Sequence, residues 1–131
     1  MIKQPRQFQA PWFPSRQQSR EQHDQRRGTA TSRGYGAEWQ RARLQHLNAN
    51  PLCVCCLANG VVEPASMVDH VVPHKGDMNV FWKSEDWQSL CDWCHKAIKA
   101  SVEYLWINGK ATQASLLLNR KHPDWRAPSE R

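Results

Sequence analysis

The sequence predicts a small α+β domain built around a metal site with four cysteine ligands. Two C-x-x-C pairs carry this prediction: Cys53 with Cys56, and Cys91 with Cys94, separated by residues 57–90. Short alternating segments between the pairs are typical of a β-hairpin, and helical patterns flank both pairs. With 131 residues, the chain has room for one domain rather than two.

Apolar spacing and chain-breaking residues indicate where each element lies. A helix over residues 37–49 places Trp39 on its inner side and ends at Asn50-Pro51. Residues 87–90 alternate as the returning strand of a hairpin. The other expected elements are a tight turn at 53–56, short β segments at 61–62 and 66–68, and helices over 92–107 and about 112–120.

Residues 1–33 are expected to form a disordered basic arm. They hold seven Lys or Arg and two acidic residues, a net charge of +5 out of +6 for the whole chain. They carry few aliphatic side chains, so they cannot bury enough surface to offset the entropy of ordering. The charge suits attachment to a polyanion, and a solvated tail without a partner explains it equally well. The body would span residues 34–126, with a short tail at 127–131.

The composition also bounds the location of the protein. No stretch approaches the roughly 20 apolar residues that a membrane helix needs. No apolar run follows the first basic residues, as it would in a secretory signal. The five cysteines are an odd number, whereas a secreted disulfide scaffold usually has an even set. We therefore expect a cytoplasmic protein that uses its thiols as metal ligands.

Four thiolates in two C-x-x-C turns form a typical ligand set for Zn²⁺. Such a tetrahedral shell leaves no open position for water, so the zinc would be structural. Two redox pairs are the alternative, but a redox C-x-x-C normally sits beside a βαβ pattern, which is missing here. Unrelated buried thiols are a further alternative. Cys55 would break the two-residue spacing and is expected to be a free thiol.

Asp69, His70 and His95 are the candidate catalytic residues. Asp69 and His70 are neighbours on an extended segment, so their side chains point in different directions. His95 directly follows the second cysteine pair, which would bring it close to them. A carboxylate and an imidazole can hold a hard divalent cation, and a neutral histidine can act as general base. A polar turn with surface histidines is the alternative.

Three segments of the chain resemble HNH endonucleases, especially the small phage-encoded kind. They are Val68–Asp77 (VDHVVPHKGD), Phe81-Trp82 and Asp86–His95 (DWQSLCDWCH). Residues 34–39 and 50–53 look similar to the same group, so the resemblance covers about residues 33–103.

The resemblance implies a ββα-metal core flanked by short helices. It makes His70 the general base, while Asp69 and His95 hold a catalytic Mg²⁺ or Mn²⁺. It implies that the protein cleaves or nicks double-stranded DNA. If the chain is phage-encoded, it would be located in the host cytosol and would act together with a phage terminase.

Asp86 stands where the family has the asparagine that gives HNH its middle letter. By the resemblance, that side chain braces the loop of the catalytic histidine with an amide that donates and accepts. An ionised carboxylate only accepts, so a weaker brace or a different bond is expected, and a role as an extra metal ligand is the alternative. A carboxylate near His70 would also raise the pKa of that imidazole.

Basic residues are candidates for binding DNA, and a plain solvated surface explains the lysines among them equally well. They are Lys75, Lys96, Lys99, Arg26, Arg27 and Arg33. A catalytically weak, zinc-stabilised DNA-binding module is the first rival to an endonuclease, and nicking of plasmid with Mg²⁺ or Mn²⁺ separates the two. A protein-interaction adaptor on a zinc scaffold is the second rival, and it predicts no salt-dependent DNA affinity.

Overall fold

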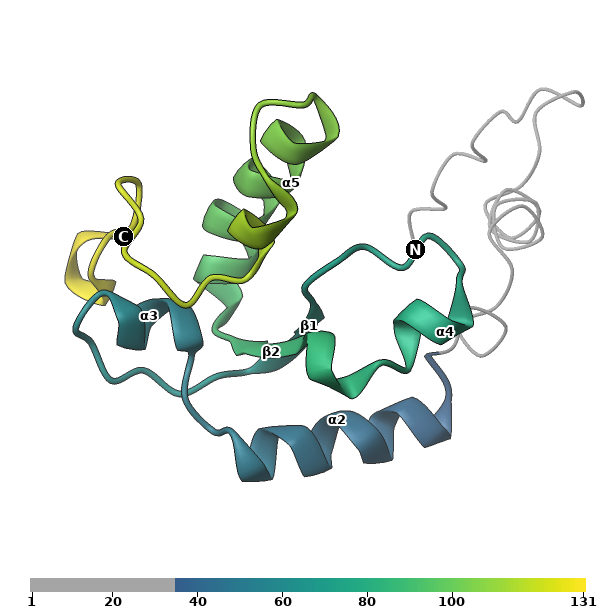
Figure 1. Cartoon of the computed structure of the whole chain (residues 1–131). Coiled ribbons are helices and arrows are strands. Elements are labelled where there is room, and N and C mark those ends of the chain that lie inside the picture. Colours follow the sequence, from purple (N-terminus) through teal and green to yellow (C-terminus); the bar gives the residue numbers. More distant parts are fainter. Residues whose placement is uncertain (1–34) are drawn as a thin grey trace, which may run out of the picture.

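The computed structural model describes residues 35–131 (Figure 1), so the expected arm with Arg26, Arg27 and Arg33 lies outside the described residues. The named helices and strands are α2 (Ala37–Ala49), α3 (Val54–Ala58), β1 (Met67–His70), α4 (Met78–Phe81), β2 (Trp87–Leu90) and α5 (Ala100–Ile107). A π-helix, Cys94–Lys99, leads directly into α5. Within residues 35–131, every helix falls short of the length and apolar character that crossing a membrane requires.

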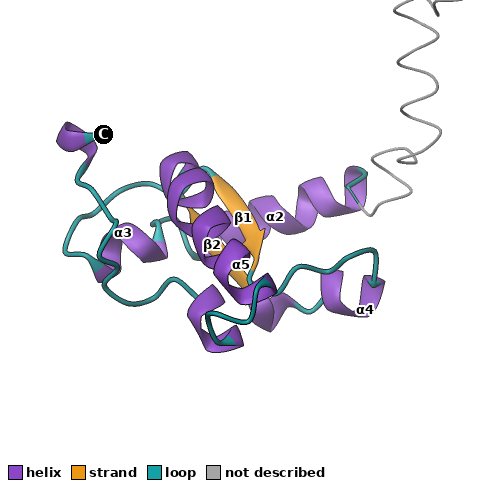
Figure 2. Cartoon of the chain, turned by 90° about the horizontal axis from the view of Figure 1, so that it is seen from above, coloured by secondary structure: helices purple, strands orange, loops and turns teal. Residues whose placement is uncertain are grey.

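The centre of the fold is the antiparallel hairpin of β1 and β2. Its register places Met67 opposite Leu90 and His70 opposite Trp87. Helix α2 lies on one side of the hairpin and the helix that contains α5 lies on the other (Figures 1 and 2). The expected returning strand is therefore confirmed. The prediction of a β segment at 61–62 is wrong. The isolated β-bridge forms between Leu52 and Pro64 instead, and Val62 is 71% exposed.

The three helices that the sequence predicts lie at the expected positions but differ in kind, whereas α3 and α4 were not predicted. Helix α2 has the expected bounds and buries Trp39. The expected helix over 92–107 is continuous, with the π segment in its middle. The expected helix near 112–120 is only a 3-10 turn, Gln113–Leu116. Leu116 and Leu118 are buried while Leu117 is exposed, and this two-residue alternation belongs to extended chain rather than to a helix.

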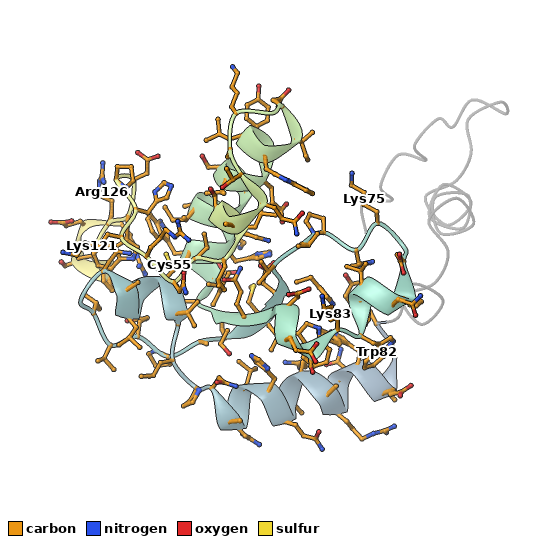
Figure 3. All side chains as sticks on the ribbon, viewed as in Figure 1. Cys55, Lys75, Trp82, Lys83, Lys121 and Arg126 are labelled. Carbon is orange, nitrogen blue, oxygen red and sulfur yellow. The ribbon has the colours of Figure 1, made fainter. Side chains whose placement is uncertain are left out.

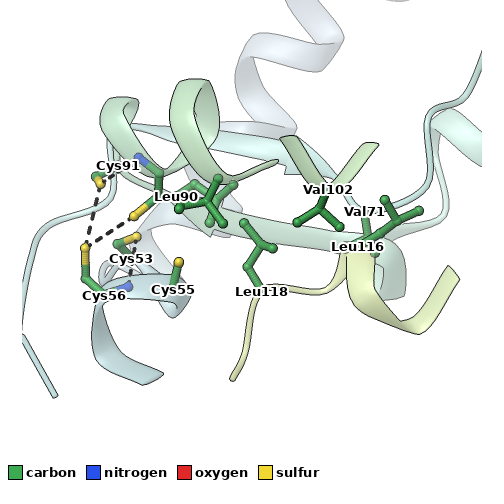
Figure 4. Close-up of a cluster of buried hydrophobic side chains, with 11 residues drawn as sticks. Cys53, Cys55, Cys56, Val71, Leu90, Cys91, Val102, Leu116 and Leu118 are labelled. Carbon is green, nitrogen blue, oxygen red and sulfur yellow. Dashed lines mark hydrogen bonds between the residues drawn. The ribbon is translucent and has the colours of Figure 1, made fainter. Parts of the chain in front are cut away.

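The core joins the cysteine pairs to the C-terminal half of the chain (Figure 4). The cysteines lie at one end of the cluster, next to Leu90. Val71, Val102, Leu116 and Leu118 pack at the other end. The cluster therefore ties the hairpin to α3 on one side and to α5 on the other.

Candidate active site and metal centre

The sulfur atoms of Cys53, Cys56, Cys91 and Cys94 all lie within 4.8 Å of one another, and all four residues are buried. Cys56 Sγ is 3.8 Å from Cys91 Sγ and 3.5 Å from Cys94 Sγ (Figure 4). Four ligands at about 2.3 Å from one tetrahedral ion are separated by about 3.8 Å, so this spacing fits a metal ion. The part of the chain that the structure describes holds all five cysteines, and none forms a disulfide.

Without a metal ion, the crowding and burial of these sulfur atoms favour their neutral thiol form. A hydrogen bond with Cys94, together with burial, raises the pKa of Cys53 to about 12. Burial raises the pKa of Cys91 as well. Crowded thiolates repel one another, and the charge of a bound metal ion would offset that repulsion and allow its ligands to lose their protons.

Two further residues lie beside the cysteine cluster. Cys55 is fully buried but is not part of the four-sulfur group, as its spacing predicts. Arg131 donates to Cys56 Sγ over 3.2 Å, and its guanidinium lies 4.2 Å from the centre of the Trp93 ring. This cation faces the side of the cluster where negative charge would gather on thiolates.

Asp69 is a buried carboxylate, 8% exposed, whose two oxygens have different partners. Oδ1 lies 3.4 Å from His95 Nε2. Oδ2 lies 2.9 Å from both Lys99 Nζ and Gln88 Nε2. Burial alone would raise the pKa of Asp69, but the hydrogen bond from His95 and the nearby Lys99 charge outweigh it and lower the pKa. The carboxylate is therefore ionised at neutral pH.

His95 stands on the π-helix, where the chain leaves the second cysteine pair. Its side chain is 42% exposed, so one side of the Asp69–His95 pair faces solvent. The hydrogen bond to Asp69 raises the pKa of His95. The structure thus brings the strand residue and the helix residue together, as expected from the sequence.

His70 ends β1 with its ring fixed on two sides. Its Nε2 lies 3.0 Å from the Phe81 carbonyl, which can only accept a hydrogen bond, so Nε2 carries the proton and Nδ1 is a free base. The ring stacks on Trp39 at 5.0 Å with a 22° interplanar angle. Burial, followed by the charge of His74, lowers the pKa of His70. His70 is therefore neutral at neutral pH.

The loop after His70 carries two further candidates. His74 is held at both ring nitrogens, because Gly76 N donates to Nδ1 over 3.0 Å and Nε2 lies 2.8 Å from the Tyr35 hydroxyl. Lys75 takes a positive φ of 50°, followed by Gly76 at 84°, and this turn sends its side chain into solvent (Figure 3). His74 is thus part of the loop's own structure, while Lys75 is exposed.

The prediction that Lys99 faces DNA is wrong. Its side chain is 1% exposed and ion-pairs with Asp69 and with Glu103, the latter over 2.7 Å. The ammonium also donates to the His70 carbonyl over 3.0 Å. Lys96 does lie on the surface, with its side chain 72% exposed and paired with Asp92. The π-helix therefore turns one lysine outward and the other into the site.

Asp86 contacts the histidine loop through its main chain. Its carbonyl accepts from Val71 N over 2.8 Å. Its side chain is 36% exposed and pairs with Lys83 over 3.4 Å. The expected increase in the pKa of His70 is wrong, because burial lowers that pKa and the carboxylate of Asp86 faces a lysine instead.

Sequence reasoning missed Gln88. This residue is 2% exposed, and its amide binds Asp69, the Leu116 carbonyl and Leu118 N. The strand register held the signal, since Gln88 lies directly opposite Asp69 and paired residues share one face of a hairpin. Lys99 and Glu103 likewise have the i, i+4 spacing of a helical ion pair.

Comparison with known proteins agrees with this arrangement. Residues 53–101 match the family model described as HNH endonuclease. A comparison with curated proteins gave no match. Among solved structures, the chain is similar to the HNH endonuclease of the deep-sea thermophilic bacteriophage GVE2, determined with a manganese ion. That likeness has a TM-score of 0.50 and 28% identity, and it covers 71% of this chain and 99% of the other. Residues 53–101 therefore form an HNH endonuclease domain, and both comparisons support a nuclease activity.

Proposed function

We propose that this protein hydrolyses phosphodiester bonds in double-stranded DNA, with His70 as general base and a divalent ion held by Asp69 and His95. The observation that carries the proposal is the close approach of Asp69 on β1 to His95 on the π-helix. Asp69 Oδ1 and His95 Nε2 lie 3.4 Å apart, and His70 is next to Asp69 in the chain.

The free Nδ1 of His70 supports its role as base. A general base must be neutral, and burial lowers the pKa of His70, which keeps the imidazole in that form at neutral pH. The Phe81 carbonyl fixes the tautomer from behind, and Trp39 holds the plane of the ring. In the proposed step, water oxygen bonds to phosphorus, its proton passes to Nδ1, and the bond from phosphorus to the leaving oxygen breaks.

The donor atoms of Asp69 and His95 fit a Mg²⁺ or Mn²⁺ ion. Two ligands at right angles and about 2.1 Å from one ion are about 3.0 Å apart, close to the observed separation. Both ions take carboxylate oxygen as a ligand, and the structurally similar phage nuclease contains manganese. Such an ion, when bound, would neutralise charge on the phosphate and on the leaving oxygen.

Zn²⁺ is the ion that we propose for the four cysteines. Thiolate ligands in tetrahedral spacing favour zinc over hard cations such as Mg²⁺. The closed ligand shell gives this ion a structural role, namely fixing α3 and the start of the π-helix at one end of β2.

Lys75 and Lys96 are the basic residues of the described chain that we propose contact DNA phosphates. Both are exposed, one on the loop after His70 and one on the helix of His95. Arg26, Arg27 and Arg33 would add phosphate contacts from the arm. The family resemblance also leads us to expect an interaction with a phage terminase. Co-purification of the two proteins from infected cells tests this.

A plasmid assay with a panel of metals tests the proposed function. The full chain should convert supercoiled plasmid to nicked or linear forms with Mg²⁺ or Mn²⁺, and Asp69→Ala and His95→Ala should weaken the response to the ion. DNA binding without any cleavage across the panel would favour the rival, a zinc-stabilised DNA-binding module. Neither cleavage nor salt-dependent binding would favour a protein adaptor.

Deletion of residues 1–33 is expected to weaken DNA binding and to flatten its salt dependence. The arm holds seven Lys or Arg, and removing one phosphate contact lowers the slope of log K against log salt by about 0.9. DNA affinity measured over a range of salt concentrations checks this. Replacing Arg26, Arg27 and Arg33 with Gln in the intact arm removes part of its charge and should flatten the slope part of the way. An unchanged slope in both proteins would mean that the arm serves something other than DNA.

Asp86→Asn is expected to leave the pH–rate profile nearly unchanged. The contact with the histidine loop is made by the main chain, and an exposed ion pair such as that with Lys83 contributes only about 0–1 kcal/mol. The profile should fall on the acid side below about pH 6.5 in both proteins, because His70 has a lowered pKa and is inactive when protonated. An alkaline shift of the parent's profile, reversed by the substitution, would contradict this.

A further inference from the structure

The two oxygens of Asp69 are not equivalent. Oδ1 faces His95 Nε2, while Oδ2 accepts from Lys99 Nζ and from Gln88 Nε2, each over 2.9 Å. Oδ2 thus has two donors from the protein itself. Only Oδ1 lies toward the other proposed ligand.

Lys99 is fixed in this position. Its ammonium has three N–H donors and three acceptors: Asp69 Oδ2, the His70 carbonyl and Glu103 Oε1. The side chain is 1% exposed, and a buried charge is costly to move away from its partners. Glu103 supplies the second negative charge, so the ammonium does not depend on Asp69 alone.

Gln88 is fixed just as firmly. Its Nε2 donates to Asp69 Oδ2 and to the Leu116 carbonyl, and its Oε1 accepts from Leu118 N. Both amide hydrogens are therefore used, and the segment after α5 holds the amide in place. Oδ2 cannot turn toward a bound ion without breaking two buried hydrogen bonds.

We propose that Lys99 and Gln88 determine which ions the site accepts, by holding Oδ2 so that Asp69 offers a single oxygen. This rests on the proposed role of Asp69 as a metal ligand. Mg²⁺ and Mn²⁺ take octahedral shells and are satisfied by one oxygen from a carboxylate. Ca²⁺ takes six to eight oxygens and gains from a carboxylate that binds through both. The two residues therefore select against calcium.

The ratio of the calcium and manganese dissociation constants tests the proposal. Both are measured by calorimetry on the zinc-loaded full chain, for the parent, Lys99→Met and Gln88→Met. Loss of the ammonium changes the electrostatic attraction of both divalent ions alike, so the ratio isolates the coordination effect. Each variant should move the ratio toward calcium by about tenfold, the size typical of changes next to metal ligands.

Lys110→Met is the matched control, because Lys110 is exposed and lies beyond α5. Its ratio should equal the parent's. Thermal unfolding shows which variants are folded, and an unchanged ratio in a folded Lys99 or Gln88 variant would overturn the proposal.

A crystal structure of the parent with Mn²⁺ tests the proposal without any variant. Asp69 should bind the ion through Oδ1 alone, and binding through both oxygens would overturn the proposal. If Asp69→Ala leaves Mn²⁺ affinity unchanged, the proposed metal site itself fails.

Discussion

Replacing His70 with alanine is expected to abolish plasmid cleavage while the protein stays folded and binds DNA. The side chain is held by the Phe81 carbonyl and by Trp39, but it is not part of the buried apolar cluster. Its removal takes away the group that accepts the proton of the attacking water. Loss of a general base lowers the rate by about 10²- to 10⁴-fold. Cleavage of supercoiled plasmid under saturating Mn²⁺ measures the effect.

Binding and folding must be measured in the same variant. DNA affinity should stay close to the parent's, because the proposed phosphate contacts come from Lys75, Lys96 and the arm. His122→Ala is a matched control, since His122 lies in the C-terminal segment beside Asn59. It should cleave like the parent. A His70 variant that cleaves as fast as this control would refute the assignment of the base.

The predictable parts of the fold are those set by local pattern. Helix α2 follows from its apolar spacing and from the stop at Asn50-Pro51, and β2 follows from alternation. The β segment at 61–62 failed because two β-branched residues favour extended chain whether or not a partner strand is present. The π-helix was not predicted for another reason. Its wider turn hardly changes the apolar pattern of the sequence, yet it determines which of the two lysines, Lys96 or Lys99, faces inward.

The residues of the site likewise fall into those that local pattern predicts and those that it does not. Asp69, His70 and His95 are candidates because of their types and spacing, and the structure places His95 Nε2 3.4 Å from Asp69 Oδ1. Lys99 was misplaced because a lysine on a short helix is exposed by default, and its burial depends on two acids from β1 and α5. Gln88 was not predicted because a single glutamine is not part of a recognisable sequence motif. Its role exists only once the hairpin register places it opposite Asp69.

Replacing Cys91 or Cys94 with serine is expected to unfold the domain. These residues join the start of the π-helix to α3 through the proposed zinc ion, and the sulfur cluster forms one whole end of the core. Binding of structural zinc contributes about 10–16 kcal/mol, and a domain of this size is stable by only about 5–15 kcal/mol. Loss of one ligand therefore removes a large part of the folding free energy. Zinc content by elemental analysis and thermal unfolding by circular dichroism measure the effect.

The spare thiol makes the test specific to the metal. Cys55 is as buried as the ligands but lies outside the four-sulfur group, so Cys55→Ala removes one buried sulfur atom and its contact with Cys94 but no proposed ligand. That variant should keep one zinc per chain and unfold cooperatively near the parent's temperature. A strong chelator should unfold the parent and Cys55→Ala alike, because the raised pKa values of Cys53 and Cys91 leave protonated thiols that no longer hold α3 to the helix. A Cys94 variant that melts like Cys55→Ala, or well-folded parent without zinc, would show that packing alone holds this end of the domain.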